Sequence, residues 1–126
     1  MEDRNLLNFK HIATFVKKIN EMFGEGNINI QLYNRLIEKT SIDSLQKHID
    51  LFSEFCRVNN EMISERNYEF EQEEVRFSEK IFINMKDVLE SCNEDNRDEL
   101  WGGLKKLSNK LCGGGGLAKS SNFLMD

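Results

Sequence analysis

Residues 6–23 read LLNFKHIATFVKKINEMF. The apolar residues of this stretch recur at steps of three and four, which places them on one face of an α-helix. Its lysines and Glu21 lie largely on the other face. The pattern predicts an amphipathic helix over about residues 3–23. Gly24 and Gly26 are expected to end this helix, because glycine adopts the left-handed backbone that follows many helices.

The same periodicity predicts four further helices. We expect them over about residues 29–39, 45–65, 75–91 and 96–111. Asn27 or Asn29 suits the N-cap of the first of these, because its side chain can accept a backbone N–H. Asn59-Asn60 is a weak point in the second helix without being a clear break. Residues 66–74 carry four glutamates and are expected to form a loop or the exposed start of a helix.

Composition supports a helical fold. The chain has no proline, so the strongest helix breaker is missing. Its 126 residues match the size of one domain. The predicted fold class is all-α, a single compact bundle of about five amphipathic helices over residues 1–112. Gly113 to Gly116 are consecutive and order only at a large entropic cost, so residues 113–126 are expected to be a flexible glycine-rich tail.

The tip of this tail is apolar. Phe123 and Leu124 are followed by Met125, and no charge intervenes before Asp126. A mobile tether that ends in an apolar segment can dock on a partner or on a neighbouring copy. If the tail is ordered, we expect Phe123 or Leu124 to lie in a groove between helices or against another chain. The alternative is a frayed terminus.

The charge balance limits the partners. The formal net charge is −5 and the isoelectric point is near 5.1, so nucleic acid and anionic membranes repel the chain as a whole. No stretch approaches the roughly 18 consecutive apolar residues of a membrane span, and no signal peptide is recognisable. We therefore expect no membrane association and a cytoplasmic location.

The cysteines give no basis for a metal site. Cys56, Cys92 and Cys112 are odd in number and widely spaced, and only His11 and His48 could join them as ligands. We expect three reduced thiols, two of them in helix cores. No cofactor is implied.

No pattern of catalytic residues is complete. His48 and Cys56 are separated by about 12 Å of helix rise and cannot form a nucleophile–base pair, so we expect a half-exposed histidine and a core cysteine. Residues 113–120 approach a phosphate-binding loop, but Ala118 replaces its second glycine and no strand precedes it. The E-x-x-H pairs of di-metal bundles are absent from the sequence. We therefore expect no enzymatic activity.

Lysines form two short clusters on the first and last predicted helices. They are Lys10, Lys17, Lys18, Lys105, Lys106 and Lys110. If these helices are neighbours, the lysines form a basic patch suited to nucleic acid, although ordinary solvated helix faces are the simpler interpretation. Gly102-Gly103 lies inside the last helix and permits a kink or the close approach of another helix.

Aromatic residues are the candidates for protein contact. Trp101 is the single tryptophan and is expected in the core beside Leu100. It also remains, with Phe123 and Leu124, a candidate contact residue for a partner. Nine phenylalanines on so few helices can leave one apolar strip uncovered, and such a strip would be an interface.

Parts of the chain resemble a known group of proteins. The segments concerned are residues 32–40, Lys47-His48-Ile49 with Phe52, Phe55 and Cys56, residues 81–85, and Leu100-Trp101. Over about residues 30–111 they resemble small helical proteins encoded by nucleocytoplasmic large DNA viruses. The resemblance implies a viral origin and a helical fold, and it implies no catalytic residues. Frequent Asn, Ile, Lys and Glu agree with an AT-rich genome.

These observations favour a non-enzymatic helical module for protein–protein interaction or self-association, with a role as a viral structural or virus-factory component. Its location would then be the host cytoplasm or the virion. The alternative is a nucleic-acid-binding or transcription-associated factor that uses the basic faces of the first and last helices.

Overall fold

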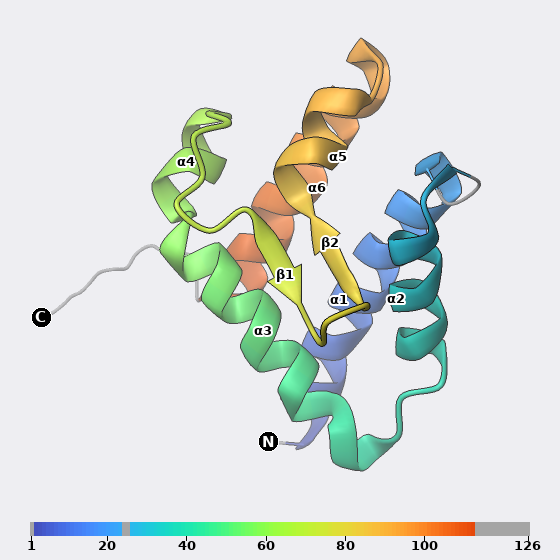
Figure 1. The fold of residues 1–126 in the computed structure, drawn as a ribbon. Helices are drawn as coiled ribbons and strands as arrows, with labels where there is room; N and C mark the ends of the chain where they lie inside the picture. Colours follow the sequence, from blue (N-terminus) through green and yellow to red (C-terminus); the bar gives the residue numbers. More distant parts are fainter. Residues whose placement is uncertain (1, 24–25, 113–126) are drawn as a thin grey trace, which may run out of the picture.

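The computed structural model describes residues 2–23 and 26–112 (Figure 1). This part of the chain contains six α-helices: α1 (Glu2–Phe23), α2 (Ile28–Glu38), α3 (Leu45–Val58), α4 (Asn60–Glu65), α5 (Met85–Ser91) and α6 (Glu94–Leu111). A 3-10 turn, η2 (Ile42–Ser44), leads into α3. Strands β1 (Glu74–Arg76) and β2 (Phe82–Asn84) pair as an antiparallel hairpin. The fold is mostly helical, as predicted.

Helix α1 is the centre of the packing. It contacts α2, α3 and α6, and the hairpin lies between α3 and α2, with β1 beside α3 and β2 beside α2 (Figure 1). The amphipathic pattern of residues 6–23 produces a helix whose apolar face is buried from Ile12 to Ile19, whereas Leu6 at its start is 42% exposed. The most completely buried large side chains come from all six described helices and the hairpin and include Ile12, Ile19, Tyr33, Phe52, Phe55, Ile63, Ile83, Met85 and Leu104.

Asparagines fix where three of the helices begin. The side chain of Asn27 accepts the backbone N–H of Ile30 at 3.1 Å, which confirms one of the two predicted caps. Asn93 accepts the N–H of Asn96 at 2.8 Å, so α6 begins at Glu94, two residues earlier than expected. Each cap satisfies a backbone donor that has no partner within the helix.

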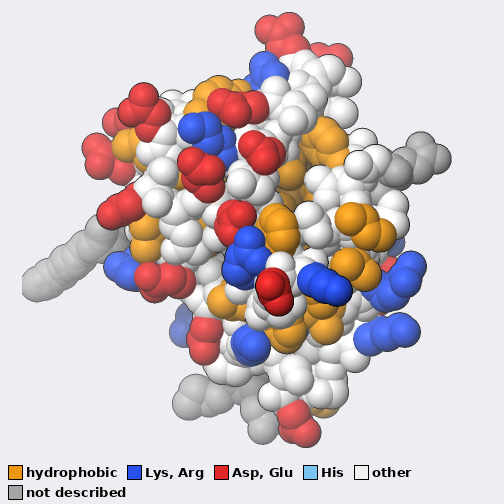
Figure 2. All heavy atoms as spheres, in the orientation of Figure 1, with side chains coloured by type: hydrophobic (Ala, Val, Ile, Leu, Met, Phe, Trp, Pro, Cys, Tyr) orange, Lys and Arg blue, Asp and Glu red, His pale blue; other side chains and the backbone are white. Residues whose placement is uncertain are grey.

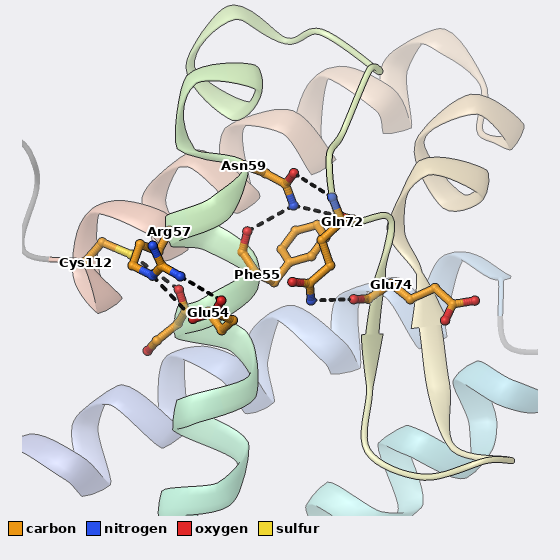
Figure 3. A network of polar contacts seen from close by, with 8 residues as sticks. Glu54, Phe55, Arg57, Asn59, Gln72, Glu74 and Cys112 are labelled. Carbon is orange, nitrogen blue, oxygen red and sulfur yellow. Dashed lines mark hydrogen bonds and ion pairs between the residues drawn. The ribbon is translucent and has the colours of Figure 1, made fainter.

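The predicted helix over residues 45–65 is interrupted at Asn59. Asn59 is 1% exposed and its side chain makes four hydrogen bonds, of which those with Phe55 and Gln72 are drawn in Figure 3. Nδ2 donates to the carbonyls of Phe55 and Gln72 at 3.0 and 2.7 Å, and Oδ1 accepts from the N–H groups of Glu71 and Gln72 at 2.9 and 3.2 Å. Asn59 thus ties the end of α3 to the segment before β1, so the prediction of a continuous helix is wrong.

The predicted helix over residues 75–91 is also wrong in its first half. Val75 and Ile83 face each other across the hairpin and are both buried, while residues 77–81 form the turn. Apolar residues at helical spacing thus come from two strands that pack side chains toward the same core. The helical part begins only at Met85, because Asn84 accepts the N–H of Asp87 at 3.0 Å and caps α5.

Candidate functional site

A groove lies between α1 and α6, which are neighbours in the fold. Its volume is about 620 Å³. Phe15 and Leu107 contribute apolar side chains, and Gly102 and Gly103 contribute bare backbone. The remaining lining is polar or charged and comprises His11, Thr14, Lys18, Arg66, Asp98, Glu99, Lys106 and Lys110.

The charges of this groove are of both signs. Lys18 Nζ lies 2.7 Å from Glu99 Oε2, and Arg66 Nη1 lies 2.6 Å from Asp98 Oδ1. Lys106 and Lys110 have no carboxylate within ion-pair distance among the described residues. Four cations against two carboxylates leave the groove with an excess of two positive charges, on a chain whose net charge is −5.

The acidic excess is concentrated elsewhere on the surface. On the face drawn in Figure 2, carboxylates gather over α4 and the segment that leads into β1. Exposed glutamates there include Glu61, Glu65, Glu69 and Glu71. The groove is therefore locally positive because the negative charges lie mainly on other parts of the molecule.

The six predicted basic residues are divided by the fold. Lys18, Lys106 and Lys110 line the groove, whereas Lys10, Lys17 and Lys105 do not. The first and last helices are neighbours, so the condition stated for a shared basic patch is met. No sequence pattern singled out Arg66, which follows α4 in the left-handed conformation, at φ 55°, and lines the groove. That conformation is uncommon for a residue other than glycine.

The two glycines of α6 differ in their surroundings. A Cβ at Gly103 would lie 3.5 Å from the ring of Phe15, so this glycine lies against α1. A Cβ at Gly102 would meet no atom within 4 Å. The close approach of another helix, one of the two roles expected for this pair, applies at Gly103. Gly102 leaves backbone open to the groove.

Replacing Gly102 with alanine is expected to raise the free energy of unfolding by about 0.5–1 kcal/mol. Glycine in a helix interior costs that much relative to alanine, and space for the methyl group exists. Urea denaturation followed by circular dichroism measures the change. A loss of stability would show that the backbone at this position has a conformation that alanine cannot adopt.

The candidate contact residues have separate locations. Trp101 is 3% exposed and lies in the core, where its ring packs against Tyr68 and Phe70 with centroid distances of 5.5 and 5.9 Å. Its ring is therefore below the surface of the folded chain. Phe123 and Leu124 lie outside the described residues, as does the approximate phosphate-binding pattern of residues 113–120.

His48 was expected to be half-exposed, and it is buried at 1% exposure. Its ring stacks on Phe77 at 5.1 Å and also contacts Phe9 and Tyr33. Nε2 lies 3.0 Å from Thr40 Oγ1, whose single proton goes to the carbonyl of Leu36 at 2.8 Å. Nε2 must therefore carry the proton and donate it to Thr40.

This tautomer leaves His48 Nδ1 as a buried acceptor with no partner among the described residues. A proton added there would place a charge in an aromatic environment without an acceptor. Burial, with a smaller contribution from the positive charge of Lys47, lowers the pKa of His48 below its usual value. His48 is therefore a buried, neutral ring that is not arranged to transfer protons to a substrate.

The lowered pKa of His48 predicts a pH dependence of stability. The unfolded chain binds a proton at His48 more readily than the folded chain does, so the free energy of unfolding should decrease as the pH falls below about 6.5. Denaturation at pH 7.5 and pH 5.5 should show this loss in the wild type and a smaller loss in His48→Gln. Lys47→Gln should reduce the loss only in part, because burial is the larger cause. An equal loss in wild type and His48→Gln would contradict the assignment.

The thiols of Cys56 and Cys112 are not arranged for nucleophilic attack. Cys56 is fully buried, and burial raises its pKa. Burial also raises the pKa of Cys112 at the end of α6. Thiolates are the reactive form, so both groups are poor nucleophiles near neutral pH. Among the side chains that the structure describes, no three of His, Cys, Asp or Glu lie close enough to hold a metal ion. None of the described helices is both long and apolar enough to cross a membrane.

The fold and its groove define a small, mostly helical domain with a charged cleft between two helices. A family of unknown function (DUF5891) matches residues 8–119, and the chain belongs to that family. No curated protein and no solved structure matches the chain.

Proposed function

We propose that this domain is a non-enzymatic protein-interaction module that binds a segment of another protein in the groove between α1 and α6. The observation that carries the proposal is the open backbone at Gly102. It lies among the apolar side chains of Phe15 and Leu107 and charges of both signs. A peptide or helix can approach closely there, bury apolar side chains and pair its own charges with those of the groove.

The mixed charges favour protein over nucleic acid. A nucleic-acid groove presents a continuous row of cations to the phosphates. In this groove Asp98 and Glu99 already neutralise Arg66 and Lys18, and their carboxylates would repel a phosphate backbone. Lys106 and Lys110 are left to attract acidic side chains of a partner.

A viral setting is the second part of the proposal. The resemblance of residues 30–111 to proteins of nucleocytoplasmic large DNA viruses supports a role as a structural or virus-factory component, in the host cytoplasm or in the virion. Mass spectrometry of purified virions and of infected-cell fractions tests this part. Peptides of the chain should be recovered from one of these two sources, and their absence from both would contradict it.

Differential capture tests the groove itself. Gly102→Leu adds a side chain at a residue that lines the groove, where no atom lies within 4 Å of the Cβ position. Asn109→Leu adds the same side chain at an exposed position of α6 that does not line the groove. Both variants and the wild type are used as bait in a lysate of the native host cells.

We expect one or more proteins to be recovered by the wild type and by Asn109→Leu and to be reduced by about tenfold or more with Gly102→Leu, a loss of about 1.4 kcal/mol of binding free energy. Equal recovery by the two variants would contradict a role for the groove. A gel-shift titration at low salt addresses the nucleic-acid alternative. That alternative would be favoured by salt-sensitive binding that is lost in the double variant Lys106→Glu, Lys110→Glu.

A further inference from the structure

We propose that the C-terminal segment of this chain, residues 117–126, docks in the α1–α6 groove and competes there with the partner. This inference rests on the proposed function, because it assigns a regulation to the same groove. Phe123 and Leu124 would pack near Phe15 and Leu107, and the carboxylate of Asp126 would pair with Lys106 or Lys110.

The segment is long enough to reach the groove. Along α6 the groove extends from Lys110 back to Asp98, about 18 Å at the rise of an α-helix. Cys112 follows directly after α6, and the eleven residues from there to Phe123 span up to about 36 Å when extended. Gly113 to Gly116 can adopt the backbone conformations that a reversal of direction requires. The chain can therefore turn back and run alongside α6.

The chemistry of the segment matches this groove. Its tip combines three apolar residues with one carboxylate, Asp126. The groove combines apolar lining with two lysines, Lys106 and Lys110, that have no carboxylate partner among the described residues. Because the segment is tethered, its effective concentration at the groove is on the order of millimolar, so even a weak site is occupied.

Other hollows on the described surface fit the segment less well. The hollow nearest to the end of α6 is lined by Asp50 and Glu54, which would repel Asp126, and Glu54 already pairs with Arg57 at 2.7 Å (Figure 3). A hollow between α1 and α2 carries Glu21 and Glu38 in an otherwise mostly polar lining. Of these three, the α1–α6 groove alone has a positive excess, and its apolar side chains, Phe15 and Leu107, are 5% and 3% exposed at its floor.

Amide chemical shifts of the full chain test the docking. The amides of Gly102 and Gly103 lie in the groove and serve as reporters. We expect them to shift between the wild type and a variant with Phe123→Ser and Leu124→Ser, while amides of α2 do not. In a Gly102→Leu background the tip substitutions should leave the Gly103 amide unmoved. Lys106→Glu with Lys110→Glu should move the reporters toward the undocked position, and adding Asp126→Lys should move them back.

Identical Gly102 and Gly103 shifts in the wild type and the tip variant would overturn the proposal. Reporter shifts that grow with protein concentration would also overturn it, because they would place the segment of a second copy in the groove. The same tip variant should raise recovery of groove-dependent partners several-fold in the capture experiment. Groove-dependent capture without reporter shifts would support the proposed function and contradict docking of the C-terminal segment. Reporter shifts without groove-dependent capture would support docking of the segment and contradict the proposed function.

Discussion

Replacement of Trp101 by alanine is expected to lower the free energy of unfolding by about 4 kcal/mol. The indole is 3% exposed and packs against Tyr68 and against Phe70, whose ring in turn meets Phe55 edge-on at 5.6 Å. The change removes the largest side chain of this aromatic cluster and leaves a cavity between α6 and the segment after α4. Stability is measured by circular dichroism in urea, since the substitution removes the only tryptophan fluorophore.

Trp101→Phe is the matched control. A phenyl ring keeps most of the contacts to Tyr68 and Phe70, so the expected loss is about 1–2 kcal/mol. If Trp101→Ala instead costs less than about 1 kcal/mol, the indole is not part of the core. Trp101 would then again be a candidate for contact with a partner at the surface.

Asn59→Ala is expected to cost about 3 kcal/mol of stability. The substitution leaves the N–H groups of Glu71 and Gln72 and the carbonyl of Gln72 without their partner. The carbonyl of Phe55 still accepts the backbone N–H of residue 59 at 3.1 Å, so it is not lost as well. Because α3 and the segment before β1 are joined here, the hairpin should also become more accessible to hydrogen exchange.

Asn60→Ala provides the control one residue further on. Asn60 is exposed, and its one contact with Ser108 is a long hydrogen bond of 3.4 Å. The expected change is within about 0.5 kcal/mol. Equal effects at residues 59 and 60 would mean that the buried amide of Asn59 does not stabilise the junction. Hydrogen exchange of the hairpin amides, measured by mass spectrometry, then separates a local from a global effect.

The sequence predicted the helices whose apolar faces are continuous, and it failed where a polar side chain or a hairpin decides the path of the chain. Residues 6–23 and 96–111 are helical as expected, because one face of each is buried against several neighbours. Asn59 was recognised as a weak point, but its partners at Glu71 and Gln72 are distant in sequence. Val75 and Ile83 pair across the hairpin, but their spacing in the sequence also fits one face of a helix, so the apolar pattern alone favoured the wrong structure.

The candidate site was predicted in part for the same reason. Lys106 and Lys110 lie four residues apart, so they share a helix face, and the glycine pair was consistent with either a kink or a close helix contact. The ion pairs of Lys18 with Glu99 and Arg66 with Asp98 join residues far apart in the chain. No local pattern reveals such pairs, and they are what changes a basic patch into a groove of mixed charge.

The placement of the hairpin has a consequence for colloidal behaviour. The outer edges of a two-stranded sheet carry unpaired backbone groups that can template the addition of strands from other molecules. Here β1 contacts α3 and β2 contacts α2, so each strand has a helix beside it (Figure 1). Each strand is also only three residues long. The folded chain should therefore resist edge-to-edge aggregation at high concentration, and fibril formation should require prior loss of α2 or α3 from the hairpin.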